Sequence, residues 1–167
     1  HRARRPMKTS HRRAAQGKRR ARHQRWAADP TILARLTDRQ TLTTEEQTRI
    51  TLPVHLAFAA IGNGTGTDAD LGTLGVALNI TAIALEGVQL CEQPIAAAQQ
   101  ALLRCAARKQ THGCYGWDGP GREAMREAID LHDQLLTHAA PAHTEAWIGQ
   151  CRARVARGEG VMEVQPA

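Results

Sequence analysis

Serine and aromatic residues are scarce in this chain of 167 residues, in which aromatic side chains make up only 3%. The single serine, Ser10, lies in a run of basic residues that offers no rigid support, which argues against a serine nucleophile. With so few aromatic rings, the core has to be built mainly from Leu, Ile, Val and Ala, a composition that favours closely packed helices. Walker A, GxGxxG and HExxH motifs are also missing. We therefore do not expect an enzyme.

Acidic residues are missing from the first 25 positions, which hold 11 of the 22 lysines and arginines. From Trp26 onward there are 11 basic and 16 acidic residues, so a head of charge +11 precedes a body of charge −5. Opposite charges of this kind indicate a basic tail that binds a polyanion or folds back on its own domain. Met7 is the only large apolar side chain of the head, which therefore buries too little surface to offset the entropy of folding.

Three segments are predicted: a disordered basic arm over residues 1–26, an α-helical body over 27–160 and a frayed tail over 161–167. Met7, followed by lysine and threonine, is typical of a translation start, and an arm beginning there would keep eight positive charges. No signal-peptide pattern is present, and the uncharged run from Leu71 to Leu85 has 15 residues, fewer than the roughly 20 of a membrane-spanning helix. We expect a cytoplasmic protein with no membrane role.

Helix start and stop signals predict an all-α fold, a single bundle of about six helices. Asp29 before Pro30 is typical of a helix start, and Thr43 with Glu46 forms a capping box. Pro53 lies inside the second helix, which either kinks there or is replaced by a new helix near Thr51. The predicted helices cover residues 30–36, 43–61, 68–86, 94–109, 122–138 and 141–157.

The third predicted helix is apolar on nearly all sides, which is typical of a helix at the centre of a bundle. Leu74 and Leu78 fall on one face, whereas Val76 falls on the opposite side. Gly72 and Gly75 lower the helix propensity by about 1 kcal/mol each, so we expect neighbouring backbones to approach closely there.

Four cysteines and eight histidines do not have the spacing of a zinc site. No pair forms CxxC or HxxxH, and the nearest approach to a ligand cluster is His112 with Cys114. Cys105 and Cys151 fall on apolar helix faces, which predicts small buried side chains. We predict no metal ion and no cofactor.

His132 lies on the apolar face of the fifth predicted helix, beside Met125, Ala128 and Ile129. A buried functional imidazole would fit this position. The favoured interpretation is a core histidine that is hydrogen-bonded to a neighbour and otherwise inert, because no convergent partner is visible in the sequence.

The loop over residues 109–121 contains four glycines together with Tyr115 and Trp117. Their rings could stack on a base or a peptide, and His112 with Cys114 could serve an enzyme. The favoured interpretation is structural: Trp117 closes one end of the bundle and Asp118 caps the following helix.

A helix-turn-helix is the remaining motif to consider, over residues 68–87 with its turn at Leu74-Gly75-Val76. Its second helix would present Asn79, Thr81 and a run of apolar residues, with no arginine, lysine or glutamine to read base edges. This composition favours a core helix.

Two stretches resemble a known group of proteins: Leu52-Pro53-Val54, and Trp117-Asp118-Gly119-Pro120-Gly121 with the helix start that follows it. The chain resembles, from about Thr43 to His138, small bacterial proteins often encoded on plasmids and integrative elements and sometimes labelled Fis-family transcriptional regulators. The resemblance implies a helical bacterial protein that associates with DNA. A Fis protein ends in a strongly basic recognition helix, whereas the last helix here offers only Arg152, Arg154 and Arg157, so no functional residue is transferred.

The sequence thus predicts a nucleic-acid-associated bacterial protein, a transcriptional regulator or an accessory DNA-binding protein of a mobile element. The predicted phosphate contacts are made, without reading sequence, by Arg12, Arg13, Lys18, Arg19, Arg20, Arg22 and Arg25. An additional basic face at Arg104, Arg108 and Lys109 would indicate a nucleic-acid groove on the body. The alternative is a helical module that binds a protein partner or a second copy and has no role on nucleic acid.

Overall fold

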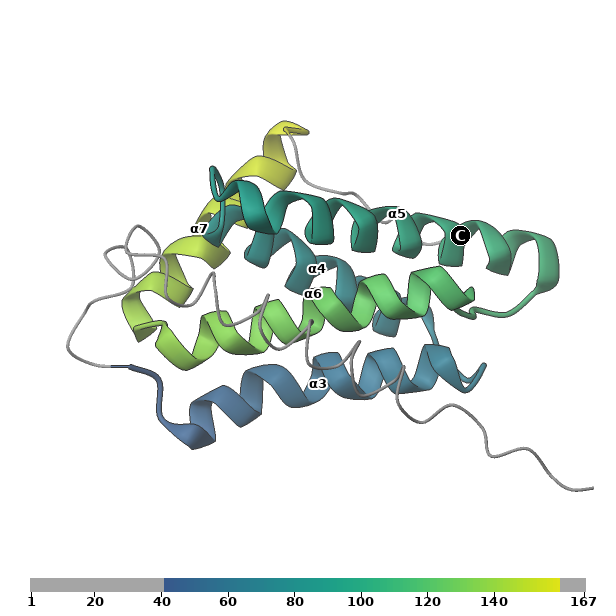
Figure 1. The fold of residues 1–167 in the computed structure, drawn as a ribbon, viewed down its shortest axis with the longest axis horizontal. Coiled ribbons are helices and arrows are strands. Elements are labelled where there is room, and N and C mark those ends of the chain that lie inside the picture. Colours follow the sequence, from purple (N-terminus) through teal and green to yellow (C-terminus); the bar gives the residue numbers. More distant parts are fainter. Residues whose placement is uncertain (1–40, 160–167) are drawn as a thin grey trace, which may run out of the picture.

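The computed structural model describes residues 41–159, and these residues form five α-helices and no strand (Figure 1). They are α3 (Thr44–Gly62), α4 (Asp68–Ala84), α5 (Gln89–His112), α6 (Gly119–His138) and α7 (Pro141–Arg157). The all-α prediction is confirmed for this part of the chain, with five helices where six were predicted. The short predicted helix after Asp29 lies outside the described residues, as do the arm over 1–26 and the tail over 161–167.

The helices α3, α4, α5 and α6 form a bundle, and α7 crosses one of its ends. In Figure 1, α3, α6 and α5 follow one another across the view, with α4 behind them. The contacts agree, because α6 packs on both α3 and α5, and α4 packs on each of the other four described helices. The prediction that the third helix is central to the bundle is therefore confirmed.

Side-chain caps fix where three of these helices begin. Thr43 Oγ1 accepts a hydrogen bond from the backbone N–H of Glu46 at 3.3 Å, and the Glu46 carboxylate accepts one from the N–H of Thr43 at 2.8 Å. Thr67 and Asp70 form the same capping box ahead of α4. Asp118 caps α6 by accepting from the N–H of Gly121. All three caps act within one turn, which is why sequence signals indicated these helices. Helix α6 nevertheless begins at Gly119, three residues before the predicted start at 122.

Prolines proved less disruptive than the sequence signals suggested. Helix α3 is continuous through Pro53, so no new helix begins near Thr51. Helix α5 begins at Gln89, five residues before Pro94, because Cys91 and Pro94 itself are buried against the rest of the bundle. Each proline removes only the hydrogen bond to the carbonyl four residues earlier, and packing outweighs that loss here.

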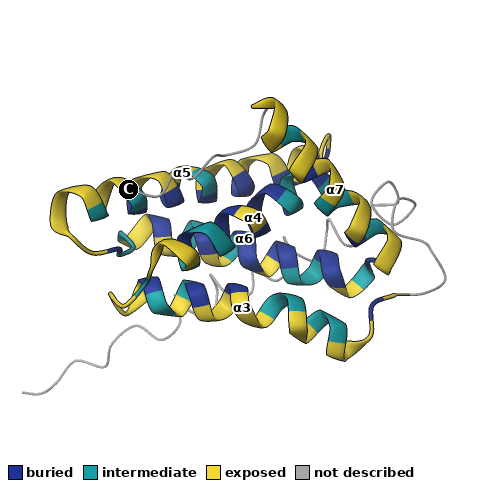
Figure 2. Cartoon of the chain, turned by 180° about the vertical axis from the view of Figure 1, so that it is seen from behind, coloured by how far each residue is buried: buried dark blue, intermediate teal, exposed yellow. Residues whose placement is uncertain are grey.

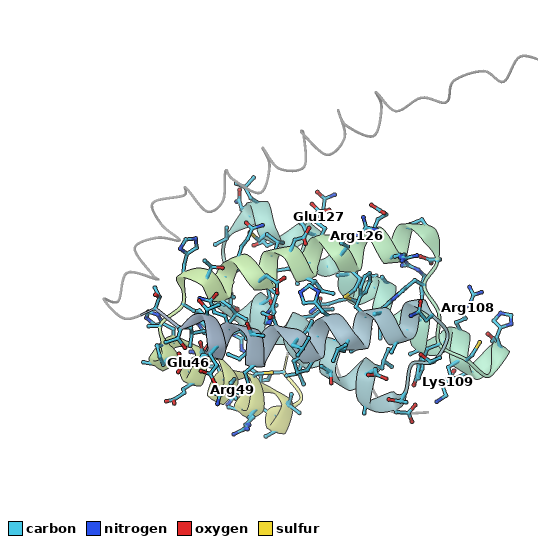
Figure 3. All side chains as sticks on the ribbon, turned by 90° about the horizontal axis from the view of Figure 1, so that it is seen from below. Glu46, Arg49, Arg108, Lys109, Arg126 and Glu127 are labelled. Carbon is cyan, nitrogen blue, oxygen red and sulfur yellow. The ribbon has the colours of Figure 1, made fainter. Side chains whose placement is uncertain are left out.

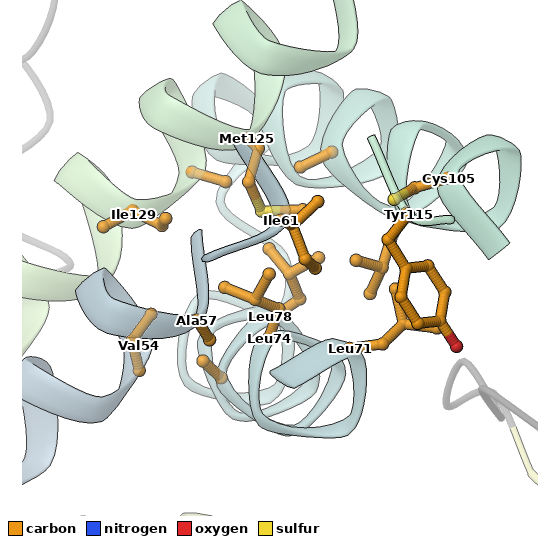
Figure 4. Packing of buried hydrophobic residues seen from close by; sticks show 14 residues of the cluster. Val54, Ala57, Ile61, Leu71, Leu74, Leu78, Cys105, Tyr115, Met125 and Ile129 are labelled. Atoms are coloured by element: carbon orange, nitrogen blue, oxygen red, sulfur yellow. The ribbon is translucent and has the colours of Figure 1, made fainter. Parts of the chain in front are cut away.

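The largest hydrophobic cluster joins α3, α4, α5 and α6 in the middle of the bundle. Figure 4 shows Ile61 of α3, Leu74 and Leu78 of α4 and Met125 of α6 gathered there, and each is at most 3% exposed. Burying a side chain of this size stabilises the fold by about 1.5–3 kcal/mol. The sides of α5 and α6 that face the bundle are buried as well, whereas much of α3 is exposed (Figure 2).

Two smaller clusters hold the end of the bundle where α7 crosses. One contains Leu85, Ile95 and Leu135, with Trp147 of α7 packed against it. The other brings Leu42, just ahead of α3, against Leu136 and Ala139. The backbone N–H of Leu42 also donates to the carbonyl of Ala139 at 2.9 Å. The described chain therefore begins at the corner between α6 and α7.

The outer side of α4 is more open than its composition suggested. Val76 is 54% exposed, and a Cβ atom added at Gly72 would meet nothing within 4 Å. The predictions that α4 is buried on all sides and that Gly72 marks a close backbone approach are therefore wrong. Helices α3, α5, α6 and α7 surround α4 only in part, and an apolar face is buried only where another helix covers it.

Candidate nucleic-acid interface

The predicted phosphate-binding residues, Arg12, Arg13, Lys18, Arg19, Arg20, Arg22 and Arg25, all lie outside the described residues. The described residues show instead whether the body adds a basic face of its own. Arg108 and Lys109 lie together at one end of the molecule, and Glu46 and Arg49 lie at the other (Figure 3).

Two of the three expected cations of this face are engaged within the body. The Nε of Arg104 donates to Oδ2 of Asp118 at 2.9 Å, and the Nζ of Lys109 donates to Oδ1 of Asp68 at 2.7 Å. Arg108 forms no ion pair with another described residue. The basic face predicted at these three positions is thus reduced to one uncommitted guanidinium.

Asp68 joins Lys109 to the buried ring of Tyr115. The Tyr115 hydroxyl donates to Oδ1 of Asp68 at 2.7 Å, and Nζ of Lys109 lies 4.6 Å from the centre of the Tyr115 ring. The hydrogen bonds from Lys109 and Tyr115 lower the pKa of Asp68. Burial and the bond to Asp68 raise the pKa of Tyr115 to about 12. These contacts tie the start of α4 to the end of α5, which is a structural task.

Trp117 and Tyr115 are both turned to the bundle. The indole Nε1 of Trp117 donates to the backbone carbonyl of Phe58 at 3.2 Å, and the ring centroids of Trp117 and Phe58 lie 5.7 Å apart. Tyr115 is 2% exposed. The hypothesis that these rings stack on a base or a peptide is wrong for Tyr115, whose ring is covered. The favoured interpretation, in which Trp117 closes the end of the bundle and Asp118 caps α6, is confirmed.

A shallow groove of about 270 Å³ lies between α5 and the loop that follows it. Arg108 and His112, one helical turn apart on α5, line this groove. Arg104 and Asp118 line it as well. The hydrogen bond from Arg104 lowers the pKa of Asp118, so this carboxylate stays negative at neutral pH and opposes a bound phosphate. The groove offers a weak place for one phosphate group and no platform for a base.

The ion pairs that Asp68 and Asp118 form with Lys109 and Arg104 are what the sequence reasoning missed. Both aspartates stand at the start of a helix, where an acidic side chain is expected for the helix alone. Lys109 lies 41 positions after Asp68 and Arg104 lies 14 positions before Asp118, and no local pattern indicates such pairs.

Cysteine and histidine do not gather into a site in the described part of the chain. His112 and Cys114 are exposed, and no group of three or more His, Cys, Asp or Glu side chains among the described residues could hold a metal ion. All four cysteines are free thiols. Cys105 and Cys151 are buried, as predicted, and burial raises the pKa of both thiols. A raised pKa disfavours the thiolate, the reactive form.

The helix-turn-helix hypothesis is wrong, because residues 68–84 form one uninterrupted helix with no turn at Gly75. Asn79 and Thr81 are buried in it and unavailable to a base edge. In helix α7, Arg154 is held by Glu86 at 2.7 Å and Arg157 by Glu159 at 2.8 Å, so two of its three arginines are paired with carboxylates.

His132 is 4% exposed, and its Nδ1 lies 2.9 Å from Oγ1 of Thr81. The prediction of a hydrogen-bonded core histidine is confirmed. Burial lowers its pKa to about 4.

None of the described helices combines the length and the apolar character needed to cross a membrane. No protein-family model, curated protein or solved structure matches the chain.

Proposed function

We propose that the protein associates with nucleic acid through phosphate contacts made by its basic arm. The supporting observation is that 11 of the 22 lysines and arginines fall within the first 25 residues, which hold no acidic residue. Each cation that neutralises a phosphate releases a condensed counterion, which favours binding without any base contact. DNA is the expected nucleic acid, and the resemblance over residues 43–138 supports a regulatory or accessory role on a bacterial mobile element.

The body supports an arm-only mode of contact. Its charge from Trp26 onward is −5, which repels a phosphate backbone. Arg104, Lys109 and Arg154 of the body are bound to carboxylates of the same chain. Binding of this kind is independent of base sequence and strongly dependent on salt.

A matched pair of triple variants tests the proposal in the full chain. One variant replaces Lys18, Arg19 and Arg20 with Gln, and the other replaces the exposed Arg122, Arg126 and Arg152 with Gln. Both lose the same charge, so any difference between them reports where the phosphates bind. Binding is measured by fluorescence anisotropy on a random 30-base-pair duplex across a salt series, and on duplex RNA of equal length.

With about six phosphate contacts, the log–log slope of affinity against salt should be near −5 for the unaltered protein. The arm variant should bring the slope about three units closer to zero, and the body variant should leave it unchanged. Equal effects of the two variants, or no binding by the unaltered protein, would refute the proposal.

A second candidate function, a protein-interaction module, is favoured by the outer face of α3. Leu52 and Leu56 are 51% and 60% exposed and stand one helical turn apart. Neighbouring exposed leucines on a helix form the kind of anchor that a partner helix or a second copy covers. Sedimentation velocity of the protein and of a Leu52→Ser, Leu56→Ser variant tests self-association. A sedimentation coefficient that rises with protein concentration, and no longer does so in the variant, would support self-association through this face. If the coefficient does not rise, self-association is refuted and only a different protein partner could cover the face.

A further inference from the structure

An open groove of about 320 Å³ lies between α3 and α4, and no lysine, arginine, aspartate or glutamate lines it. Of its two polar lining residues, Thr73 donates its hydroxyl hydrogen to the carbonyl of Ala69 at 2.9 Å, and His132 is only 4% exposed. The groove therefore suits an apolar occupant, which would remove its walls from water. These walls come mainly from Ile50, Pro53 and Val54 of α3 and from Gly72, Val76 and Ile80 of α4.

The α4 wall of the groove is apolar and yet exposed. Val76 is 54% exposed, and a Cβ atom at Gly72 would meet nothing within 4 Å, so the described residues leave this wall uncovered. Ile80, one helical turn after Val76, is only partly buried. The wall extends over about 12 Å of helix from Gly72 to Ile80. A contiguous apolar surface of this kind is typical of a place where another segment packs.

The described chain enters the bundle beside this groove. Ile50, which lines the groove, also packs against the cluster that contains Leu42 and Leu136. The backbone N–H of Leu42 donates to the carbonyl of Ala139, which fixes the entry point. The residues that precede Leu42 in the chain therefore start close to the groove.

Residues 30–36 hold the last three large apolar side chains before Leu42, and they lie outside the described residues. The sequence predicts a helix there, with Ile32, Leu33 and Leu36 on one side. Seven helical residues span about 10 Å, which is close to the length of the α4 wall. Leu36 precedes Leu42 by six positions, and six extended residues span up to about 20 Å. The segment is thus long enough to cover the wall and close enough to reach it.

A short tether favours the chain's own segment over a second copy as the occupant. Only residues 37–41 separate Leu36 from Leu42. A tether of this length keeps the segment near the groove at an effective concentration on the order of millimolar, well above that of another molecule in dilute solution. We propose that residues 30–36 dock in the groove between α3 and α4 as a short helix whose apolar side covers Val76 and Ile80.

Cysteine cross-linking in the full chain tests the proposal. Cys114, which is the exposed cysteine, is first replaced with serine. One variant then carries Leu33→Cys with Val76→Cys, and its control carries Leu33→Cys with Leu52→Cys. Leu52 is 51% exposed, nearly as much as Val76, and it lies only ten positions after Leu42 but does not line the groove. The tether brings both positions within range of Leu33, whereas docking brings only Val76 next to it.

Under mild oxidation the Val76 pair should form a disulfide within one chain about tenfold faster than the Leu52 pair, as followed on a non-reducing gel. Equal rates would mean that the segment passes freely over both positions and would overturn the proposal. A disulfide between two chains at Val76 would place a second copy in the groove and would overturn it as well. So would the absence of any disulfide at Val76.

Methyl chemical shifts test the same contact without new cysteines. A Leu33→Ser variant of the full chain should shift the methyl signals of Val76 and Ile80 in a ¹H–¹³C correlation spectrum, because weaker docking would return these groups to water. Ala34→Ser is the control, since Ala34 falls on the opposite side of the predicted helix and should leave both signals in place. Unchanged signals in the Leu33→Ser variant, or equal shifts in the two variants, would contradict docking.

Discussion

Thr81 of α4 and His132 of α6 meet in the core through a 2.9 Å contact between Oγ1 and Nδ1, although 51 positions separate them in the chain. The hydroxyl also holds the carbonyl of Ala77 in its own helix. This arrangement connects two central helices by a polar contact inside an otherwise apolar region, and it sets the tautomer of the imidazole.

Replacing Thr81 with Val should therefore destabilise the fold by about 1–3 kcal/mol, because it leaves the Nδ1–H of His132 buried without an acceptor. Thr73→Val is the matched control. Thr73 also donates to the carbonyl four residues earlier, but it is only half-buried and has no partner in another helix. Urea denaturation should show a loss for Thr81→Val and a change below about 0.5 kcal/mol for Thr73→Val. Equal losses would contradict the assigned role of the hydroxyl.

Acid should weaken the fold through His132. The pKa of this group is about 4 in the folded protein and 6.5 ordinarily. Between these values the unfolded chain binds a proton that the folded chain does not, so the stability is complete above pH 6.5 and falls as the pH falls towards 4. The total loss from this group is about 3 kcal/mol. The free energy of unfolding, measured from pH 7.5 to 4, should fall less steeply for His132→Leu, and parallel curves would contradict the prediction.

Tyr115 provides a direct optical readout, because it is the only tyrosine of the chain. The folded protein should titrate at about pH 12 by absorbance near 295 nm, since burial and the bond to Asp68 raise the pKa of the phenol. The stability linked to this group is complete below pH 10 and is lost as the pH rises through 12. Asp68→Asn should lower the midpoint of the folded protein. The same absorbance titration in concentrated urea should show a midpoint near 10 for both proteins.

Two glycines should respond to alanine in opposite directions. Gly72 lies inside α4 with free space at its Cβ position, so Gly72→Ala should stabilise the protein by up to about 1 kcal/mol through helix propensity. At Gly66 an added Cβ would lie 2.6 Å from Cγ1 and 2.9 Å from Cα of Ile61. Gly66→Ala should therefore cost about 1–3 kcal/mol. Thermal denaturation of the two variants measures both effects, and a gain at Gly66 would contradict the packing described for this loop.

Features set by neighbours in the chain were predictable, and those set by distant contacts were not. The capping residues Thr43 and Asp118 act on backbone groups within one turn, and both were recognised from the sequence. The start of α5 was missed because its N-cap, Val88, makes no side-chain hydrogen bond and so leaves no signal.

The candidate sites also divide into features that are visible in the sequence and features that depend on packing. The basic arm is visible as a run of charge, whereas the pairing of Lys109 with Asp68 depends on how α4 and α5 pack. The open side of α4 at Val76 was also missed. A helix that is apolar on all sides does not indicate which side remains open, because the positions of α3, α5, α6 and α7 decide it.

The hydrogen bond from Leu42 to Ala139 fixes the point at which the described chain enters the bundle. The chain enters the bundle at the corner between α6 and α7, whereas Arg108 lies at the far end, beyond the length of α3 (Figure 3). Nineteen helical residues span about 28 Å. Arg25, the last of the predicted phosphate-binding residues, precedes Leu42 by 17 positions, and 17 extended residues span at most about 60 Å. This reach exceeds the length of α3, so the entry point leaves Arg108 within range of a duplex that the arm binds.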